Sequence, residues 1–71
     1  MRVSIKTLSG DVFNIKVDSA CNSYALGDEV IESVAKELKV EYRQIVLFQN
    51  GEIVDWKDEI DTGSFLEVFV N

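Results

Sequence analysis

The 71-residue chain has no histidine, no proline and a single cysteine, Cys21. Without histidine there can be no Ser-His-Asp or Cys-His catalytic pair, and one cysteine without histidine cannot build a zinc site. A lone cysteine also excludes an internal disulfide. We therefore expect a protein that is not an enzyme and that binds no cofactor or metal. Cys21 has no neighbouring base that would activate its thiol, and we interpret it as a bystander.

The sequence also lacks any apolar run near the roughly 18 residues that a membrane-spanning helix needs. Its first residues show no basic segment followed by an apolar core, so no secretory signal is visible. We predict a soluble domain that does not bind membranes. A cytoplasmic or nuclear location follows as the expectation.

Positive charge is scarce: thirteen acidic residues against seven basic ones give a formal net charge of −6. This acidic balance opposes binding to phosphate backbones, so we expect no nucleic-acid partner. Five of the acids gather at Glu52, Asp55, Asp58, Glu59 and Asp61. That stretch lacks the alternating ligands and central glycine of an EF-hand, and we interpret it as a solvated loop.

Alternating apolar and polar residues begin the chain. The pattern runs through Val3–Thr7 and resumes over Phe13–Val17, with Gly10 in the short segment between. Period-2 alternation is typical of strands with one buried face, and the glycine-containing connection predicts a hairpin. We expect Val3 and Ile5 to point into the core.

A helical pattern follows a polar, aperiodic segment, Asp18–Tyr24, that we predict to be a loop. The apolar residues recur at helical spacing, namely Leu26, Val30, Ile31, Val34, Ala35 and Leu38. The spacing predicts an amphipathic helix with one buried face. Asp28 or Ser23 is the expected cap at its start.

The second half of the chain again has strand patterns. Gln44–Phe48 is β-branched and aromatic, Asn50-Gly51 is a strong hairpin-turn signal, and Glu52–Val54 can return as a short strand. An acidic, turn-like segment then precedes a last strand over Phe65–Val70. We predict a single α+β domain over residues 1–71, of the β-grasp type, with a mixed sheet of four or five strands packed on one helix in the order ββαββ.

The residues that build the first hairpin carry a resemblance. Met1, Val3, the run Ile5–Gly10 and the series Phe13, Ile15, Val17 resemble the first hairpin of ubiquitin almost position by position, and thinner matches continue to Val68. The chain thus resembles a divergent member of the ubiquitin-like family. About five residues of the family pattern are missing between Val54 and Ile60. We therefore expect no helical turn there, and we expect Trp56 to close the bottom of the core.

The carboxyl end departs from the family pattern. Ubiquitin-like modifiers carry a flexible tail ending in Gly-Gly, whereas this sequence ends at Val70-Asn71. The resemblance therefore implies a domain that is not conjugated as it stands, unless a longer parent chain carries the tail. Lys6 matches one of the family's chain-forming lysines, but the other such positions hold different residues, so ordinary polyubiquitin chains are not expected.

Strand alternation predicts an apolar surface on the face turned away from the helix. Leu66, Val68 and Val70 should face the helix, and so should Ile45 and Leu47. The outward positions are then Phe65, Glu67 and Phe69 on the last strand and Val46 and Phe48 on the third. Together with Leu8 in the first turn, we expect a patch made of Leu8, Val46, Phe48, Phe69 and Phe65.

The resemblance implies a function for this patch. Leu8, Phe48 and Phe69 match the three apolar positions through which ubiquitin meets most of its receptors. Glu67 replaces the family's histidine and Val46 an arginine, so receptors that read ubiquitin's basic rim should bind poorly. We expect a protein partner at this face and include Lys6 and Glu67 among the contact residues.

Four alternatives stay open at this point. The strand aromatics could serve only to stabilise the sheet through cross-strand pairs. The partner could be a second copy of the chain, or the domain could be a structural part of a larger assembly. The fourth is a modifier whose Gly-Gly tail lies outside the sequence.

Overall fold

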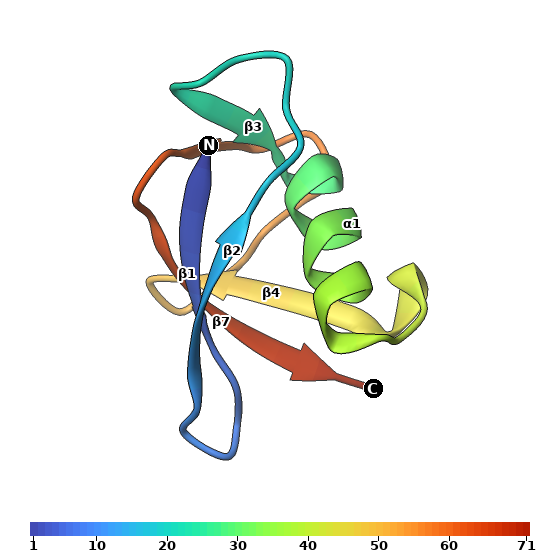
Figure 1. The fold of residues 1–71 in the computed structure, drawn as a ribbon. Coiled ribbons are helices and arrows are strands. Elements are labelled where there is room, and N and C mark those ends of the chain that lie inside the picture. The colour runs from blue at the N-terminus through green and yellow to red at the C-terminus, as the bar shows by residue number, and fades with distance from the viewer.

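The chain opens with an antiparallel hairpin in the computed structural model, which describes all residues from Met1 to Asn71 (Figure 1). Strand β1 (Arg2–Lys6) pairs with β2 (Val12–Lys16), so that Val3 lies opposite Ile15. The side chains of Val3 and Ile5 are 1% and 0% exposed. The predicted hairpin and the inward direction of both residues are confirmed.

Five strands form one mixed sheet in the order β2-β1-β7-β4-β5. The other three strands are β4 (Ile45–Gln49), β5 (Glu52–Ile53) and β7 (Phe65–Val70). The central strand, β7, pairs parallel with β1, and the other three pairs are antiparallel. Together with the single helix, this sheet confirms the predicted α+β class.

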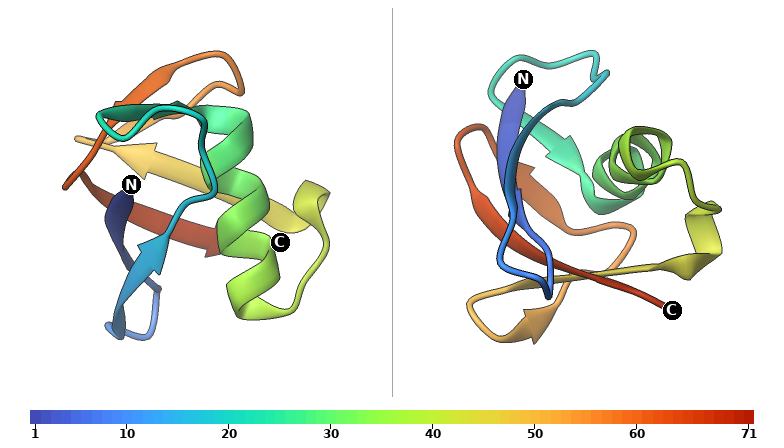
Figure 2. Two further views of the ribbon diagram at one scale, coloured as in Figure 1. Left: turned by 45° about the horizontal axis from the view of Figure 1, so that its top comes forward. Right: turned by 60° about the horizontal axis from the view of Figure 1, so that its bottom comes forward.

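Helix α1 (Gly27–Leu38) lies across one face of the sheet (Figure 2). Its apolar stripe faces the strands as predicted at Val30, Ile31, Val34 and Ala35, which are all buried. Leu38 is half-buried, whereas Leu26 precedes the helix and is 37% exposed. Fifteen buried hydrophobic residues form one core between the helix and the sheet, and no polar side chain is buried with them. The opposite face of the sheet carries no helix and is turned to solvent (Figure 2).

The start of the helix differs from the prediction, since neither Ser23 nor Asp28 is its cap. Leu26 is the N-cap residue, and its N–H donates to the Glu29 carboxylate at 3.0 Å. The first helical N–H groups donate instead to backbone carbonyls of a distant turn: Gly27 to Asp58 at 2.7 Å and Asp28 to Trp56 at 2.8 Å. The free donors of the first turn are thus satisfied by tertiary contacts that no local sequence signal reveals.

A second, two-stranded ladder was missed by the sequence patterns. Strand β3 (Tyr24–Leu26), predicted to be loop and helix, pairs antiparallel with β6 (Glu59–Asp61), predicted to be a turn. Ala25 and Ile60 face each other in this ladder and are both 1% exposed. The prediction for Trp56 is wrong for the same reason: its side chain is 61% exposed, because Ile60 fills the end of the core instead.

The connections on either side of β4 are tight. A short 3₁₀ helix, η1 (Tyr42–Gln44), leads from α1 into β4. After β4, Asn50 and Gly51 have φ values of 54° and 82°, and the ladder closes with Gln49 opposite Glu52. The predicted Asn-Gly hairpin turn is confirmed, and no helix forms between Val54 and Ile60.

Candidate protein-binding face

The outer face of the sheet, opposite α1, brings together the apolar side chains predicted to lie there. The register places Val46 opposite Phe69, and Phe48 opposite Glu67. On its other side Phe48 lies opposite Ile53 of β5. Because side chains alternate along each strand, all five of these residues point away from the buried face that holds Leu47, Leu66 and Val68.

Exposure follows this alternation closely on β7. Phe65 and Phe69 are 53% and 41% exposed, whereas Leu66 and Val68 between them are buried at 0% and 3%. On β4, Val46 and Phe48 are half-buried between neighbouring strands. Val70 departs from the prediction that it faces the core. It lies opposite Ile45 at the last rung of the ladder and is 40% exposed, because the sheet ends there.

Ile53 belongs to this surface and was missed by the sequence analysis. It is 66% exposed and directly opposite Phe48. The sequence signal that could have revealed it is the two-residue turn Asn50-Gly51. Such a turn fixes the register of the two strands, and here it places Phe48 opposite Ile53. We call the set Leu8, Val46, Phe48, Ile53 and Phe69 the outer-face patch.

Leu8 and Phe65 lie at opposite ends of this surface. Leu8 is 79% exposed in the turn that follows β1. Strands β1 and β7 are parallel, and Lys6 lies opposite Glu67. The turn that carries Leu8 comes after Lys6, just as Phe69 comes after Glu67, so Leu8 and Phe69 lie towards the same end of the sheet. Phe65 lies opposite Ser4, on the other side of Glu67. Glu67 also lies opposite Phe48, so Phe65 is a diagonal neighbour of Phe48 and borders the outer-face patch.

The two charged residues Lys6 and Glu67 are available to a partner. Lys6 and Glu67 face each other across β1 and β7, but they form no ion pair. The one ion pair in the structure joins Arg43 and Glu41 at 2.9 Å, and both side chains are exposed. A protein that covers the outer-face patch would therefore meet the free carboxylate of Glu67 beside Phe48, and the free ammonium of Lys6 on the neighbouring strand.

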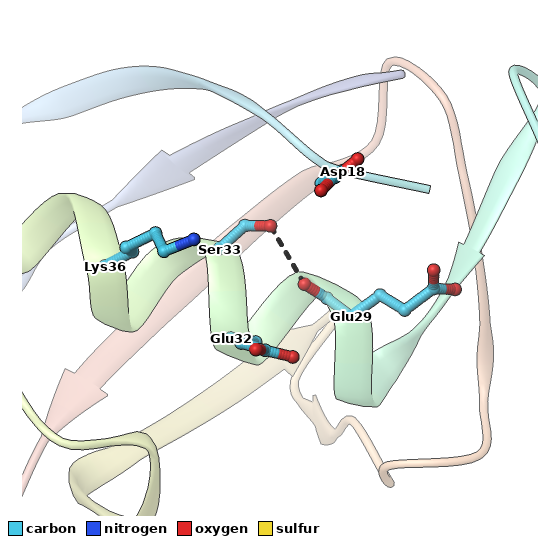
Figure 3. Close-up of a pocket in the computed structure, with 5 residues that line it drawn as sticks. All are labelled: Asp18, Glu29, Glu32, Ser33 and Lys36. Atoms are coloured by element: carbon cyan, nitrogen blue, oxygen red, sulfur yellow. Dashed lines mark hydrogen bonds between the residues drawn. The ribbon is translucent and has the colours of Figure 1, made fainter. Parts of the chain in front are cut away.

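Other parts of the molecule offer less evidence of a binding site. A shallow polar hollow on the exposed side of α1 is lined by Asp18, Glu29, Glu32, Ser33 and Lys36, with no hydrophobic residue (Figure 3). The Ser33 hydroxyl is occupied there, because it donates to the backbone carbonyl of Glu29 at 3.0 Å. No three histidine, cysteine or acidic side chains lie close enough together to hold a metal ion.

Two groups have shifted pKa values. Hydrogen bonding to the Ser23 hydroxyl, 3.1 Å away, and to the Ser23 backbone lowers the pKa of the Cys21 thiol below its ordinary value. The cause is a hydroxyl together with backbone groups and not a base, so the interpretation of Cys21 as a bystander stays a prediction. The Tyr42 hydroxyl donates to the Asp28 carboxylate at 2.7 Å, which raises the pKa of Tyr42 to about 12.

Comparison with known proteins adds no assignment: no family model matches the sequence, and no curated protein matches it significantly. The only α-helix, α1, has twelve residues and is too short to cross a membrane. The outer-face patch is therefore the feature of the molecule on which a functional argument rests.

Proposed function

We propose that this chain is a divergent ubiquitin-like domain of the β-grasp type that binds another protein through the outer-face patch. Two observations support this family: the first hairpin resembles that of ubiquitin, and the chain then forms one helix and returns to the same sheet. The proposed activity is recognition and not catalysis. A reducing compartment, the cytoplasm or nucleus, fits a domain whose only cysteine is a free thiol.

The observation that carries the proposal is the cluster of large apolar side chains on the uncovered face of the sheet. Leu8, Ile53 and Phe69 are 79%, 66% and 41% exposed, and the half-buried Val46 and Phe48 lie between the strands that carry Ile53 and Phe69. Monomeric proteins seldom leave contiguous apolar patches of this kind on their surface unless the patch binds something. Removing this apolar surface from water is favourable by about 25 cal/mol per square ångström, and the costs of association are set against that gain.

The partner should combine an apolar contact surface with charges that suit Lys6 and Glu67. Aromatic residues at the centre of an interface are frequent hot spots, so Phe48 and Phe69 are expected to dominate the binding energy. Glu67 and Lys6 then select the partner's polar groups, because Glu67 lies beside Phe48 and Lys6 lies opposite Glu67, so both would lose solvent at the interface. Receptors that read the basic rim of ubiquitin should bind poorly, because Glu67 and Val46 stand where the family has a histidine and an arginine.

A capture experiment from the native source tests the proposal with the wild-type chain and the double variant Phe48→Ala/Phe69→Ala. We expect the double variant to keep its fold and to lose the partner. Tyr42→Ala is the matched control, because Tyr42 is an aromatic residue of nearly the same exposure, 42%, on η1. It should retain the partner.

Two outcomes would overturn this function. Retention of the same partner by the double variant would show that the patch is not the binding site. A stable oligomer of the purified wild type, lost in the double variant, would show that the face is buried between copies and that the domain is a structural subunit. Size-exclusion chromatography with light scattering distinguishes this second case.

A further inference from the structure

Trp56 is the only tryptophan of the chain, and it stands outside the five-stranded sheet on the turn between β5 and β6. Its side chain is 61% exposed. Two other exposed apolar residues, Tyr24 and Leu26, border the same end of the molecule: Leu26 directly precedes Gly27, whose N–H bonds to this turn. The turn therefore presents a large aromatic surface that contributes little to the core.

Hydrogen bonds hold the Trp56 backbone in place. The Asp55 carboxylate accepts the Trp56 N–H at 2.7 Å, and the Asp58 carboxylate accepts the Asp55 N–H at 2.8 Å. The Trp56 carbonyl accepts the N–H of Asp28 at 2.8 Å, which ties the turn to the start of α1. An aromatic residue on such a preorganised turn loses little backbone freedom when a ligand binds it.

The residues around Trp56 are strongly acidic. Segment 52–61 holds one lysine, Lys57, against five acids, and two more acids lie in the first turn of α1: Glu52, Asp55, Asp58, Glu59, Asp61, Asp28 and Glu29. Asp55 and Asp58 each use one carboxylate oxygen within the turn. The other oxygens of both groups have no partner in the structure. An exposed indole in this negative field is suited to a cation, because the ring face and the carboxylates attract the same charge.

We propose that the Trp56 turn is a second docking surface, which binds an arginine or lysine side chain from a basic segment of a partner protein. The cationic group stacks on the indole and donates hydrogen bonds to the neighbouring carboxylates. Arginine is the better fit, since its planar guanidinium can do both at once. A second copy of this chain does not suit the surface, because the copy would bring the same acids against it.

A hexa-arginine peptide is the probe for this surface, with hexa-lysine and hexa-glutamate peptides as comparisons. Binding is followed by fluorescence, since Trp56 is the only indole. We expect a saturable change with hexa-arginine, a weaker one with hexa-lysine and none with hexa-glutamate. Affinity should fall as salt is added, because surface charge attraction is screened.

Trp56→Leu separates stacking from simple charge attraction, because it keeps every acid and removes only the ring. Calorimetry should show about two- to fivefold weaker binding of hexa-arginine, the range of an exposed cation–π contact. Asp61→Asn and Asp11→Asn then form a matched pair with equal net charge. Asp61 lies opposite Tyr24, whereas Asp11 lies in the turn between β1 and β2. Only Asp61→Asn should weaken binding.

Unchanged affinity in Trp56→Leu, or equal losses in the two aspartate variants, would reduce the effect to nonspecific attraction by an acidic protein and would overturn the proposal. This test is independent of the outer-face patch. Phe48→Ala/Phe69→Ala should bind hexa-arginine as the wild type does. Loss in that variant would place the basic ligand on the sheet face instead and would also overturn the Trp56 site.

Discussion

Gly27 and Asp55 touch where helix α1 meets the turn after β5: a Cβ added to Gly27 would overlap the carbonyl oxygen of Asp55. Gly27 also donates its N–H to Asp58 at 2.7 Å. Replacing a helical glycine by alanine ordinarily stabilises a protein by about 0.5–1 kcal/mol. Here we expect the opposite, a loss of about 1–3 kcal/mol for Gly27→Ala, because the obstacle is backbone and cannot rotate away. Chemical denaturation measures the change.

The control for this variant is Glu32→Ala, an exposed position on the same helix. Its unfolding free energy should stay within about 0.5 kcal/mol of the wild type. A Gly27→Ala protein as stable as the wild type would mean that the helix and the turn can move apart without cost. The backbone hydrogen bonds that cap α1 would then be weaker than the geometry indicates.

This contact also shows why part of the fold could not be predicted from the sequence. The hairpin of β1 and β2 and the buried stripe of α1 could be predicted, because their signals are local and periodic. Strands β3 and β6 have three residues each, too few for a period, and each is stabilised by the other from far along the chain. The backbone carbonyls that cap α1 carry no side-chain signal at all.

The candidate binding face was predictable to a similar degree. Alternation placed Phe48 and Phe69 correctly on the outer face, and it failed only at the last rung, where Val70 has no cover. Trp56 was misplaced for a different reason. Residues of the family pattern are missing between Val54 and Ile60, and a large aromatic residue in that segment suggests that it fills the core. Instead, the ladder of β3 and β6 places Ile60 in the core and leaves Trp56 exposed.

Neighbouring residues on β7 should respond very differently to truncation. Leu66 is 0% exposed and Phe65 is 53% exposed. Leu66→Ala should lower the unfolding free energy by about 2–5 kcal/mol through lost burial and a cavity. Phe65→Ala should cost less than about 1 kcal/mol, although it removes the larger side chain. Urea denaturation of both variants provides the comparison, and equal losses would show that the outer face is packed in solution.

The turn between β4 and β5 requires positive φ at both central residues. Gly51 has a φ of 82° with open space around its Cα, so strain and not collision limits a replacement there. Gly51→Ala should destabilise the protein by about 1–2 kcal/mol, the cost of a left-handed conformation for an L-residue. Asn50→Gly should cost much less, because glycine adopts this conformation readily. Thermal unfolding of the two variants tests the difference, and a larger loss in Asn50→Gly would contradict it.

The hydrogen bond from Tyr42 to Asp28 should make stability depend on pH in the alkaline range. It raises the pKa of Tyr42 to about 12 in the folded state, against about 10 in the unfolded chain. The bond therefore contributes fully below about pH 10, and its contribution is lost as pH rises towards 12. Because Tyr42 is 42% exposed, solvent screening should keep the contribution below about 1 kcal/mol.

Tyr42→Phe isolates this effect from the titration of lysines in the same pH range. We expect the wild type to be more stable than Tyr42→Phe at pH 8, with the difference shrinking between about pH 10 and 12 as the hydroxyl ionises. Urea denaturation at several pH values measures the difference, and the ultraviolet absorbance of tyrosinate follows the ionisation directly. A difference that stays constant to pH 12 would mean that the Tyr42 hydroxyl does not donate to Asp28 in solution.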